Sequence, residues 1–296
     1  MTESRAARPL GRSGVTVPAL GVGTNRWGDS VTDQARLTAT LTAAIDSGIG
    51  FIDTAEVYGY GRSEKTIAQA IRHDGRPLSL ASKFLPLPYR VSAAQFASAL
   101  DHTLERLGRN SLDIYYLHFP WSVRGVGYWM KAMARAVKAG KIRAVGISNC
   151  NAAQMRAAAA ELARHDIPLA ANQVHYSLLH RKPETNGVLD ACRQMDVALV
   201  AWQPLNAGVL SAGSGGSALG DTLRGIATAR RATVAQVALA WLLQRDGHVI
   251  AIPGATRPEH VRDNAGALTL DLSDEEFVAL DRASAPAPSK PISSVS

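Results

Sequence analysis

Short apolar runs alternate with longer segments whose apolar residues recur at helical spacing, from one end of the sequence to the other. Eight of the short runs have the length and composition of buried β-strands. Helical segments fit between them, for example over residues 33–47, 93–107, 152–164 and 234–244. Eight such pairs in under 300 residues predict an α/β fold, a parallel (β/α)8 TIM barrel, rather than a doubly wound sheet. The predicted strands span residues 20–23, 50–53, 78–83, 112–118, 144–148, 171–175, 198–202 and 249–253.

Some segments fall outside this repeat. Residues 9–17, with Ser13-Gly14 at the turn, predict an N-terminal β-hairpin that would cover the bottom of the barrel. Residues 273–283 predict an extra C-terminal helix, because a capping serine is followed by three acidic residues. The Gly/Ser-rich residues 212–217 predict a flexible stretch in a short loop over residues 206–220, which would form only a weak clamp over one barrel face.

The composition favours one globular domain over residues 1–296, with its core at about 10–280 and a loose Pro/Ser-rich tail over 285–296. Apolar residues make up 46% of the chain, yet no run reaches the roughly 20 residues that cross a bilayer. Residues 1–9 lack the apolar stretch of a secretory signal. Cys150 and Cys192 have no metal-ligand or disulfide-framework spacing. We therefore expect a cytoplasmic protein without a bound metal.

The chain is basic, with a formal net charge of +7 and an isoelectric point near 9.6. Its lysines and arginines are scattered rather than gathered into a basic arm, which argues against a nucleic-acid partner. A basic cleft would still favour a phosphorylated cofactor. We expect a small-molecule substrate, no membrane partner, and a monomer or weak homo-oligomer.

Polar residues stand where consecutive predicted strands end. Asp53, Lys83 and His118 end the second, third and fourth strands, and Tyr58 follows the second. Each has a simpler explanation: a helix cap, a solvated lysine, a core histidine or an aromatic residue in a Gly-rich turn. In a barrel, however, the C-terminal ends of the strands meet at one face. Their occurrence together therefore favours one shared active site.

These four residues suit the reduction of a carbonyl group. That reaction needs a hydride donor and an acid that protonates the oxygen. We expect the ammonium group of Lys83 to lower the pKa of the Tyr58 phenol by roughly two to three units, which corresponds to about 3 to 4 kcal/mol. Asp53 would keep Lys83 charged, and His118 would orient the carbonyl by a hydrogen bond.

Residues 50–59, 82–83, 112–118 and 146–149 resemble the signature segments of the aldo-keto reductase family, and the likeness runs from about residue 10 to 280. It implies an NADP-dependent oxidoreductase that acts on the CH–OH group of its donor and reversibly reduces an aldehyde or ketone. It also implies that four residues form the family's catalytic tetrad, with Tyr58 as the general acid: Asp53, Tyr58, Lys83 and His118.

The same resemblance implies contacts with NADPH. Ser148, Asn149 and Gln173 would bind the carboxamide of the nicotinamide, although the first two could simply cap a helix. Trp202 would stack on the nicotinamide ring, and its alternative is a buried structural tryptophan. Because Gly254 and His260 replace basic residues of several family branches, the preference for NADPH depends mainly on Arg257, and NADH is not excluded. The remaining implied contacts are Gln203, Pro204, Leu205, Gly254, Thr256, Arg257 and Asn264.

Three aromatic residues next to strand ends predict a wall for an apolar or aromatic carbonyl substrate: Trp27, Phe119 and Trp121. Ordinary packing is the alternative for each of them. The segments at residues 145–149 and 173–179 resemble the pyridoxal-reductase-like branch of the family more than its steroid-reducing members.

Two other functions fit a barrel with these residues. Lys83 could form a Schiff base with the substrate, as in aldolase-type chemistry. A barrel of this family could also be a non-catalytic regulatory subunit that binds the cofactor and a partner protein. A Gly-rich dinucleotide fingerprint is excluded, because the glycines at 21, 23 and 28 have the wrong spacing for G-x-G-x-x-G.

Overall fold

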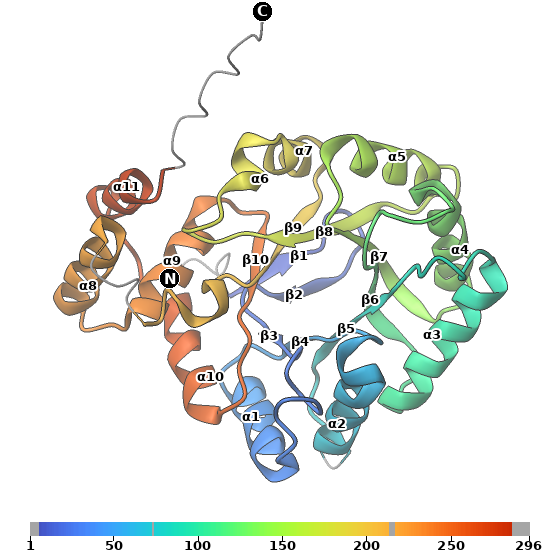
Figure 1. The fold of residues 1–296 in the computed structure, drawn as a ribbon, viewed down its shortest axis with the longest axis horizontal. Helices are drawn as coiled ribbons and strands as arrows, with labels where there is room; N and C mark the ends of the chain where they lie inside the picture. The colour runs from blue at the N-terminus through green and yellow to red at the C-terminus, as the bar shows by residue number, and fades with distance from the viewer. Residues whose placement is uncertain (1–5, 73, 213–216, 286–296) are drawn as a thin grey trace, which may run out of the picture.

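A computed structural model describes residues 6–72, 74–212 and 217–285. Its central feature is a sheet of eight parallel strands with helices around it (Figure 1). The strand order is β10-β9-β8-β7-β6-β5-β4-β3, so each strand pairs with its neighbour in the sequence. The strands are β3 (Val22–Gly23), β4 (Phe51–Asp53), β5 (Ser79–Phe84), β6 (Leu112–Leu117), β7 (Ile142–Ser148), β8 (Leu169–His175), β9 (Ala198–Trp202) and β10 (Val249–Ile252).

The sheet curves until its first and last strands meet. The amide of Gly21 donates to the carbonyl of Ala251 at 2.8 Å, and the amide of Gly23 donates to that of Pro253 at 3.0 Å. In the other direction, Ala251 donates to Ala19 at 3.0 Å. These bonds join β3 to β10 and nearly close the barrel. The predicted (β/α)8 architecture is therefore confirmed, with the strands within two residues of their predicted positions.

Helices follow the strands and cover the outside of the barrel (Figure 1). The helices predicted over residues 33–47, 93–107, 152–164 and 234–244 are present, with ends shifted by one residue at most. The helices are α1 (Gln34–Asp46), α2 (Arg62–Ile71), α3 (Ala93–Leu107), α4 (Val126–Lys138), α5 (Ala152–Ala163), α6 (Lys182–Thr185), α7 (Val188–Met195), α8 (Ala218–Arg230), α9 (Val234–Arg245), α10 (Pro258–Ala265) and α11 (Asp274–Ala283).

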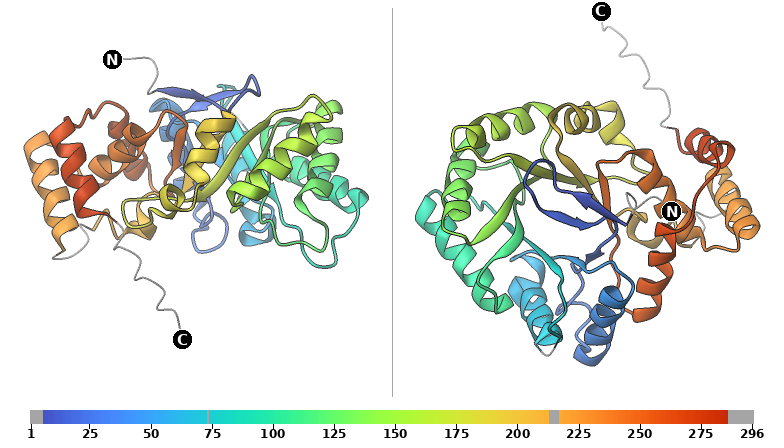
Figure 2. Two further views of the ribbon diagram at one scale, coloured as in Figure 1. Left: turned by 90° about the horizontal axis from the view of Figure 1, so that it is seen from above. Right: turned by 180° about the vertical axis from the view of Figure 1, so that it is seen from behind.

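The N-terminal hairpin consists of β1 (Ala7–Pro9) and β2 (Thr16–Pro18), which pair antiparallel. Figure 2 (right) shows it lying across one end of the barrel. This is the end at which the strands begin, because Gly11 packs against the carbonyl groups of Leu169 and Ala170 at the start of β8. Leu10 of the hairpin is fully buried in the apolar cluster inside the barrel. The other end is left open for a site.

Helices α8 and α11 lie side by side outside the ring (Figures 1 and 2). The extra C-terminal helix is confirmed, and it begins with a capping box in which Ser273 and Glu276 bond each other's backbone amides. Helix α8 corrects the expected loop over residues 206–220, because its N-cap Ser217 accepts a bond from Gly220 and starts the helix inside that range. Residues 213–216 and the tail beyond 285 lie outside the described residues.

Candidate active site

The centre of the site is the ammonium group of Lys83, a fully buried side chain of β5. It donates to Asp53 Oδ1 at 2.5 Å, to the carbonyl of Thr54 at 2.8 Å and to the hydroxyl of Tyr58 at 3.2 Å. These three acceptors satisfy all three N–H groups of an ammonium. The buried lysine is therefore fully paired, and the explanation of Lys83 as a solvated strand-end residue does not apply.

Asp53 is held from two sides at the end of β4. Lys83 bonds one carboxylate oxygen, and Gln173 Nε2 donates to the other at 2.7 Å. The carboxylate of Asp53 therefore faces the inside of the barrel and does not cap a helix. Glu56, the other acidic residue nearby, accepts from the amide of Leu85 at 2.7 Å and pairs with Arg90, which ties the loop after β4 to the loop after β5.

Tyr58 reaches Lys83 because the chain turns sharply after β4. Gly59 and Tyr60 both have a φ of +56° in this turn, a conformation that a non-glycine residue such as Tyr60 rarely adopts. Hydroxyl groups fix the base of the turn: Ser63 Oγ lies 2.9 Å from the hydroxyl of Thr54 and 2.9 Å from that of Thr24. The Tyr58 phenol is thereby directed at the ammonium, with the ring centroid 4.8 Å from the Lys83 nitrogen.

The charges in this cluster differ from the expectation in one respect. Burial alone would lower the pKa of the Lys83 ammonium, but the adjoining Asp53 carboxylate and Tyr58 oxygen raise the pKa above its usual value. Burial raises the pKa of the Tyr58 phenol, and this effect exceeds the lowering by Lys83, while the Asp53 charge raises the pKa further. The expected decrease for Tyr58 was therefore wrong for the free protein. The phenol is protonated at neutral pH.

His118 follows β6, and its ring lies next to that of Tyr58. Its side chain is 8% exposed, and its ring centroid lies 6.0 Å from that of Tyr58 in an edge-on arrangement. Burial, assisted by the charge of Lys83, lowers the pKa of His118 to about 3, so the imidazole is neutral at physiological pH. Among the described residues its Nδ1 atom has no hydrogen-bond partner. A buried imidazole nitrogen without a partner can accept or donate a bond to a ligand.

The lowered pKa of His118 predicts how stability changes with pH. An unfolded histidine titrates near 6.5 and the folded residue near 3, so the unfolded chain binds more protons between these values. Stability from this residue is complete above pH 6.5 and is lost as the pH falls through that window. Between pH 7 and pH 5 the expected loss is about 2 kcal/mol.

Urea unfolding at both pH values measures this loss, with His118→Phe as the control. The free energy of unfolding of the wild type should fall by that amount more than the free energy of unfolding of the variant. Equal decreases in the two proteins would mean that His118 is accessible to protons in the folded state.

Two further strand ends contribute polar groups beside the tetrad. Ser148 Oγ at the end of β7 donates to the carbonyl of Gln173 at 2.9 Å, and Asn149 Nδ2 donates to Ser148 Oγ at 3.0 Å. Asn149 and Gln203 have φ values of +58° and +50°, left-handed conformations that are costly for residues other than glycine. Neither Ser148 nor Asn149 caps helix α5, whose N-cap is Asn151.

Trp202, at the end of β9, is part of a stack of three rings. Its indole lies on His175 with centroids 4.4 Å apart, and His175 lies on His180 with centroids 3.9 Å apart. The indole nitrogen donates to Asn149 Oδ1 at 3.2 Å, which fixes the ring in its plane. Trp202 is partly buried and lines a cavity at the ends of the strands.

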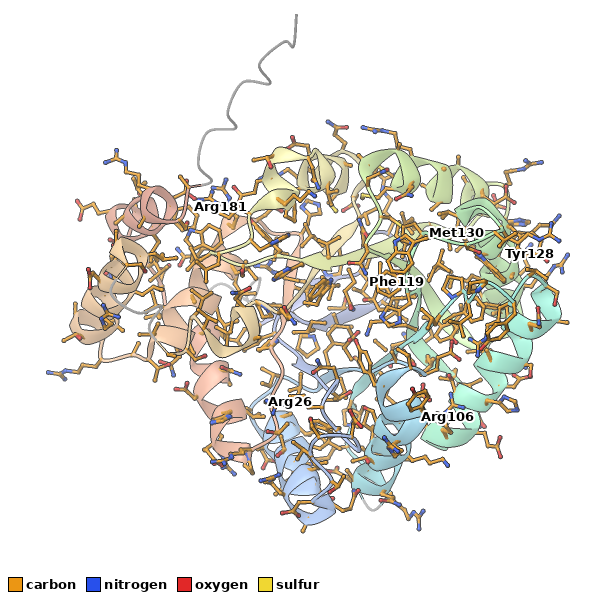
Figure 3. The ribbon with its side chains drawn as sticks, in the orientation of Figure 1. Arg26, Arg106, Phe119, Tyr128, Met130 and Arg181 are labelled. Carbon is orange, nitrogen blue, oxygen red and sulfur yellow. The ribbon has the colours of Figure 1, made fainter. Side chains whose placement is uncertain are left out.

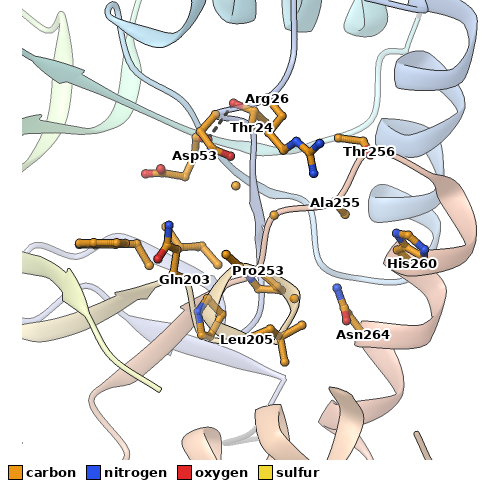
Figure 4. A pocket seen from close by; sticks show the side chains of 18 of the residues that line it. Thr24, Arg26, Asp53, Gln203, Leu205, Pro253, Ala255, Thr256, His260 and Asn264 are labelled. Carbon is orange, nitrogen blue, oxygen red and sulfur yellow. Dashed lines mark hydrogen bonds between the residues drawn. The ribbon is translucent and has the colours of Figure 1, made fainter. Parts of the chain in front are cut away.

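A cavity of about 760 Å³ opens at the ends of the strands and includes Asp53, Tyr58 and His118 in its wall. Figure 4 shows it extending from Asp53 to His260 and Asn264 of helix α10. Cavities of this size accept ligands as large as a nucleotide. Ten of the eleven expected cofactor contacts line it: Ser148, Asn149, Gln173, Trp202, Gln203, Pro204, Leu205, Gly254, Thr256 and Asn264.

Arg257, the eleventh expected contact, does not line this cavity. It is the N-cap residue of α10, its side chain is 56% exposed, and it forms a loose ion pair with Glu259 at 3.9 Å. On the opposite side of the cavity, the loop after β3 contributes Thr24, Asn25 and Arg26, which the sequence analysis did not identify. Their only sequence signal was their place after the first strand, a position equivalent to that of the identified residues.

The three expected substrate-wall residues lie in different surroundings. Phe119 lines the cavity and stacks on His118, with centroids 4.7 Å apart. Trp121 stacks on the far side of Phe119 but is 70% exposed and lies outside the cavity. Trp27 is fully buried and donates its indole N–H to the carbonyl of Ala255 at 2.8 Å. In Figure 3, Phe119 lies beside β6 and β7, whereas Arg26 lies on the side of α1 and α10.

Neither membrane spans nor metal sites were found in the described part of the chain. No helix there is both long enough and apolar enough to cross a membrane. No group of three or more His, Cys, Asp or Glu side chains among those residues is placed to hold a metal ion.

Comparison with known proteins gives one family. The model of the aldo/keto reductase family matches residues 19–285. The chain is 35% identical over 274 residues to methylglyoxal reductase YeaE of Escherichia coli, which covers 91% of this chain and 92% of that protein. It is 32% identical over 300 residues to the aldo-keto reductase yakc [NADP(+)] of Schizosaccharomyces pombe, covering 88% and 86%.

Among solved structures, the fold is similar to that of an aldo-keto reductase from Klebsiella pneumoniae in complex with NADPH. The TM-score is 0.83 at 35% sequence identity, and the match covers 96% of this chain and 97% of that one. The similarity of sequence and fold thus extends over nearly the full length of that relative.

Proposed function

The chain belongs to the aldo/keto reductase family, and on that basis we propose that it reduces the carbonyl group of an aldehyde or ketone with NADPH, reversibly. One observation carries the proposal. The buried Lys83 ammonium contacts both Asp53 and the Tyr58 hydroxyl, and that hydroxyl is at the wall of a nucleotide-sized cavity. An acid is thereby positioned where a bound carbonyl can reach it.

The residues of the cavity fit a nicotinamide dinucleotide. Amide and hydroxyl groups of Ser148, Asn149 and Gln173 surround the end next to Asp53, where they would bind the carboxamide. The indole of Trp202 is backed by His175 and would stack on the nicotinamide ring. Thr256 and Asn264 would bind the adenosine end. When bound, NADPH supplies the hydride.

Each member of the tetrad has a role in the proposed reaction. Tyr58 donates its hydroxyl proton to the carbonyl oxygen as the carbonyl carbon receives the hydride, so the product is an alcohol and Tyr58 is left as a phenolate. Lys83 stabilises this phenolate through the 3.2 Å contact. Asp53 keeps the ammonium in place, and the neutral ring of His118 orients the carbonyl by a hydrogen bond. In the oxidation direction the phenolate accepts the proton.

The raised pKa of Tyr58 has two opposite effects in this scheme. It keeps the acid protonated at neutral pH, but it also makes the phenol a weaker acid in the free protein. Catalysis therefore depends on the cation that meets the developing phenolate, because stabilisation of charge in the transition state accelerates the step. Lys83 is suited to this, since it is fully charged and shielded from water.

The names of similar proteins support the cofactor and the substrate class. The Schizosaccharomyces pombe relative carries NADP(+) in its name, the Klebsiella pneumoniae structure contains NADPH, and the Escherichia coli relative is a methylglyoxal reductase. Membership of the pyridoxal-reductase-like branch stays a prediction. The same holds for the preference for NADPH over NADH, the cytoplasmic location, the single-domain organisation and the oligomeric state.

The Schiff-base alternative is disfavoured by the charge of Lys83. A nucleophilic amine must lose its proton, and such lysines have a lowered pKa. Here the pKa of Lys83 is raised, and the amine is bonded to a carboxylate. The non-catalytic alternative has no specific observation in its favour, because all four tetrad side chains are present: three line the cavity, and the fourth, Lys83, contacts two of these three.

The proposed function is tested by following NADPH absorbance with methylglyoxal, pyridoxal, 4-nitrobenzaldehyde and simple ketones. We expect NADPH oxidation with at least one aldehyde and release of the matching alcohol. NADPH binding without turnover of any of them, together with co-purification of a larger protein, would favour the regulatory-subunit alternative. Borohydride trapping of a substrate on Lys83 would favour the Schiff base.

A further inference from the structure

Tyr116 is a buried tyrosine of β6 to which the proposed reaction gives no role. It pairs in register with Lys83 on one neighbouring strand and with Gly146 on the other, so its side chain points into the barrel, as that of Lys83 does. Its ring is fully buried and belongs to the apolar cluster inside the barrel. A Cβ atom at Gly146 would collide with this ring. The absence of a side chain at position 146 therefore makes room for Tyr116 next to the tetrad.

The hydroxyl of Tyr116 has no hydrogen-bond partner of normal geometry among the described residues. An unsatisfied buried hydroxyl costs free energy, and a phenylalanine would fill the same space without this cost. Burial raises the pKa of the phenol well above its usual value, the charge of Asp53 raises the pKa further, and the Gln173 side chain opposes both effects. The hydroxyl is thus a protonated donor without an acceptor, and it lies near Asp53 and Gln173.

Asp53 is an acceptor in this region whose present bonds can change. Lys83 bonds one of its carboxylate oxygens, and Gln173 Nε2 donates to the other at 2.7 Å. Gln173 also lines the cavity, and the proposed function assigns its amide to the carboxamide of the nicotinamide. An amide that turns toward the cavity moves its N–H groups away from Asp53. Among the described residues, the carboxylate would then keep the bond from Lys83 alone, unless another donor reaches it.

We propose that the Tyr116 hydroxyl is a reserve donor for Asp53, which bonds the carboxylate when Gln173 turns to the nicotinamide carboxamide. A hydroxyl hydrogen rotates about its C–O bond and can turn to an acceptor that lacks a partner. This inference rests on the proposed function, because it requires the cavity to be the cofactor site. Tyr116 is then a positioning residue. It keeps Asp53 bonded from two sides, and hence Lys83 in place beside Tyr58, when the cofactor is bound.

The first test uses the protein without cofactor and measures chemical unfolding of the wild type, Tyr116→Phe, Gln173→Leu and the double variant. Tyr116→Phe should unfold at the denaturant concentration of the wild type or at a higher one, because it removes an unpaired buried hydroxyl. Gln173→Leu alone should lower the midpoint little, since Tyr116 replaces the lost donor. In the Tyr116→Phe background the same substitution should lower the midpoint by at least about twice as much, which is the non-additivity expected of coupled residues.

The second test measures the dissociation constant of NADPH for the wild type and Tyr116→Phe, by cofactor fluorescence or calorimetry. Loss of a hydrogen bond to a charged group weakens binding by roughly tenfold. We expect this weakening in Tyr116→Phe, although the free variant is as stable as the wild type. Tyr115→Phe is the matched control and should leave the constant unchanged. Tyr115 is also buried with an unpartnered hydroxyl, but its ring packs against Phe96 of α3, outside the barrel.

Three other outcomes overturn the inference. Additive losses of stability in the four proteins, or an unchanged NADPH dissociation constant in Tyr116→Phe, would mean that Gln173 keeps its bond to Asp53 in the complex. A lower unfolding midpoint of Tyr116→Phe than of the wild type would assign the hydroxyl to the stability of the free fold. In these cases the proposed function stands if the wild type still binds and oxidises NADPH. If the wild type binds no nicotinamide dinucleotide, the proposed function fails, and the cofactor-linked exchange fails with it.

Discussion

Tyr58→Phe should reduce the rate of NADPH-dependent carbonyl reduction by roughly 10²- to 10⁴-fold, the usual contribution of a general acid. The variant keeps the aromatic ring and removes only the hydroxyl. In the wild type this hydroxyl is one of three acceptors of the Lys83 ammonium, and the two shorter bonds, to Asp53 and Thr54, are retained in the variant. Folding and cofactor binding are therefore expected to remain, while the proton donor is lost.

Steady-state kinetics with the best aldehyde of the panel measure this effect, and the dissociation constant of NADPH is the internal control. The matched control variant is Tyr60→Phe, since Tyr60 is two residues away and 90% exposed. Turnover by Tyr58→Phe within a few-fold of the wild type would show that another group protonates the carbonyl oxygen. A comparable loss in Tyr60→Phe would instead point to a disturbed turn after β4.

Lys83→Met should remove activity and also destabilise the fold by about 3 to 5 kcal/mol, the cost of leaving one partner of a buried ion pair uncompensated. Both side chains are almost fully buried: the exposed fraction is 0% for Lys83 and 2% for Asp53. Without the ammonium, the Asp53 carboxylate keeps, among the described residues, only the bond from Gln173. Either it stays charged in an apolar environment or it takes up a proton, and both cost free energy.

The double variant Lys83→Met with Asp53→Asn separates the two effects. It removes both charges, so most of the lost stability should return, as it does when buried ion pairs are replaced together. Activity should not return, because the phenolate of Tyr58 would still lack a cation. Chemical denaturation and turnover are measured on all three proteins. A single variant as stable as the wild type would mean that Lys83 and Asp53 are each uncharged in the folded state.

The barrel was predictable because its signals are local. The strands from 112–117 to 198–202 are mostly apolar and mostly buried, and their ends lie within two residues of the predicted positions. Helix α3 spans the predicted residues, since a capping box at Ser92 starts it and Gly108 ends it in a left-handed conformation. The start of α8 was missed, because the Gly/Ser-rich segment before Ser217 conceals the cap.

Much of the candidate site was also predictable, for a topological reason. In a parallel barrel all strand ends meet at one face, so residues at sequence positions 53, 83 and 118 must lie near one another once the strands are known. The same reasoning placed Gln173 and Trp202 beside them. It did not extend to Arg26, because a residue three positions beyond the end of a strand can point in several directions.

The sequence by itself therefore determined the order of strands and helices, the face that holds the site, and the identity of the side chains at the strand ends. The tertiary structure decided which of these side chains touch and how each is charged. Burial raises the pKa of Tyr58 despite the adjacent Lys83. Trp27, which was predicted to form part of the substrate wall, is instead buried and fixes the loop of Arg26 through its bond to the carbonyl of Ala255. Desolvation and orientation depend on what surrounds a group in three dimensions, and the order of residues along the chain does not contain that information.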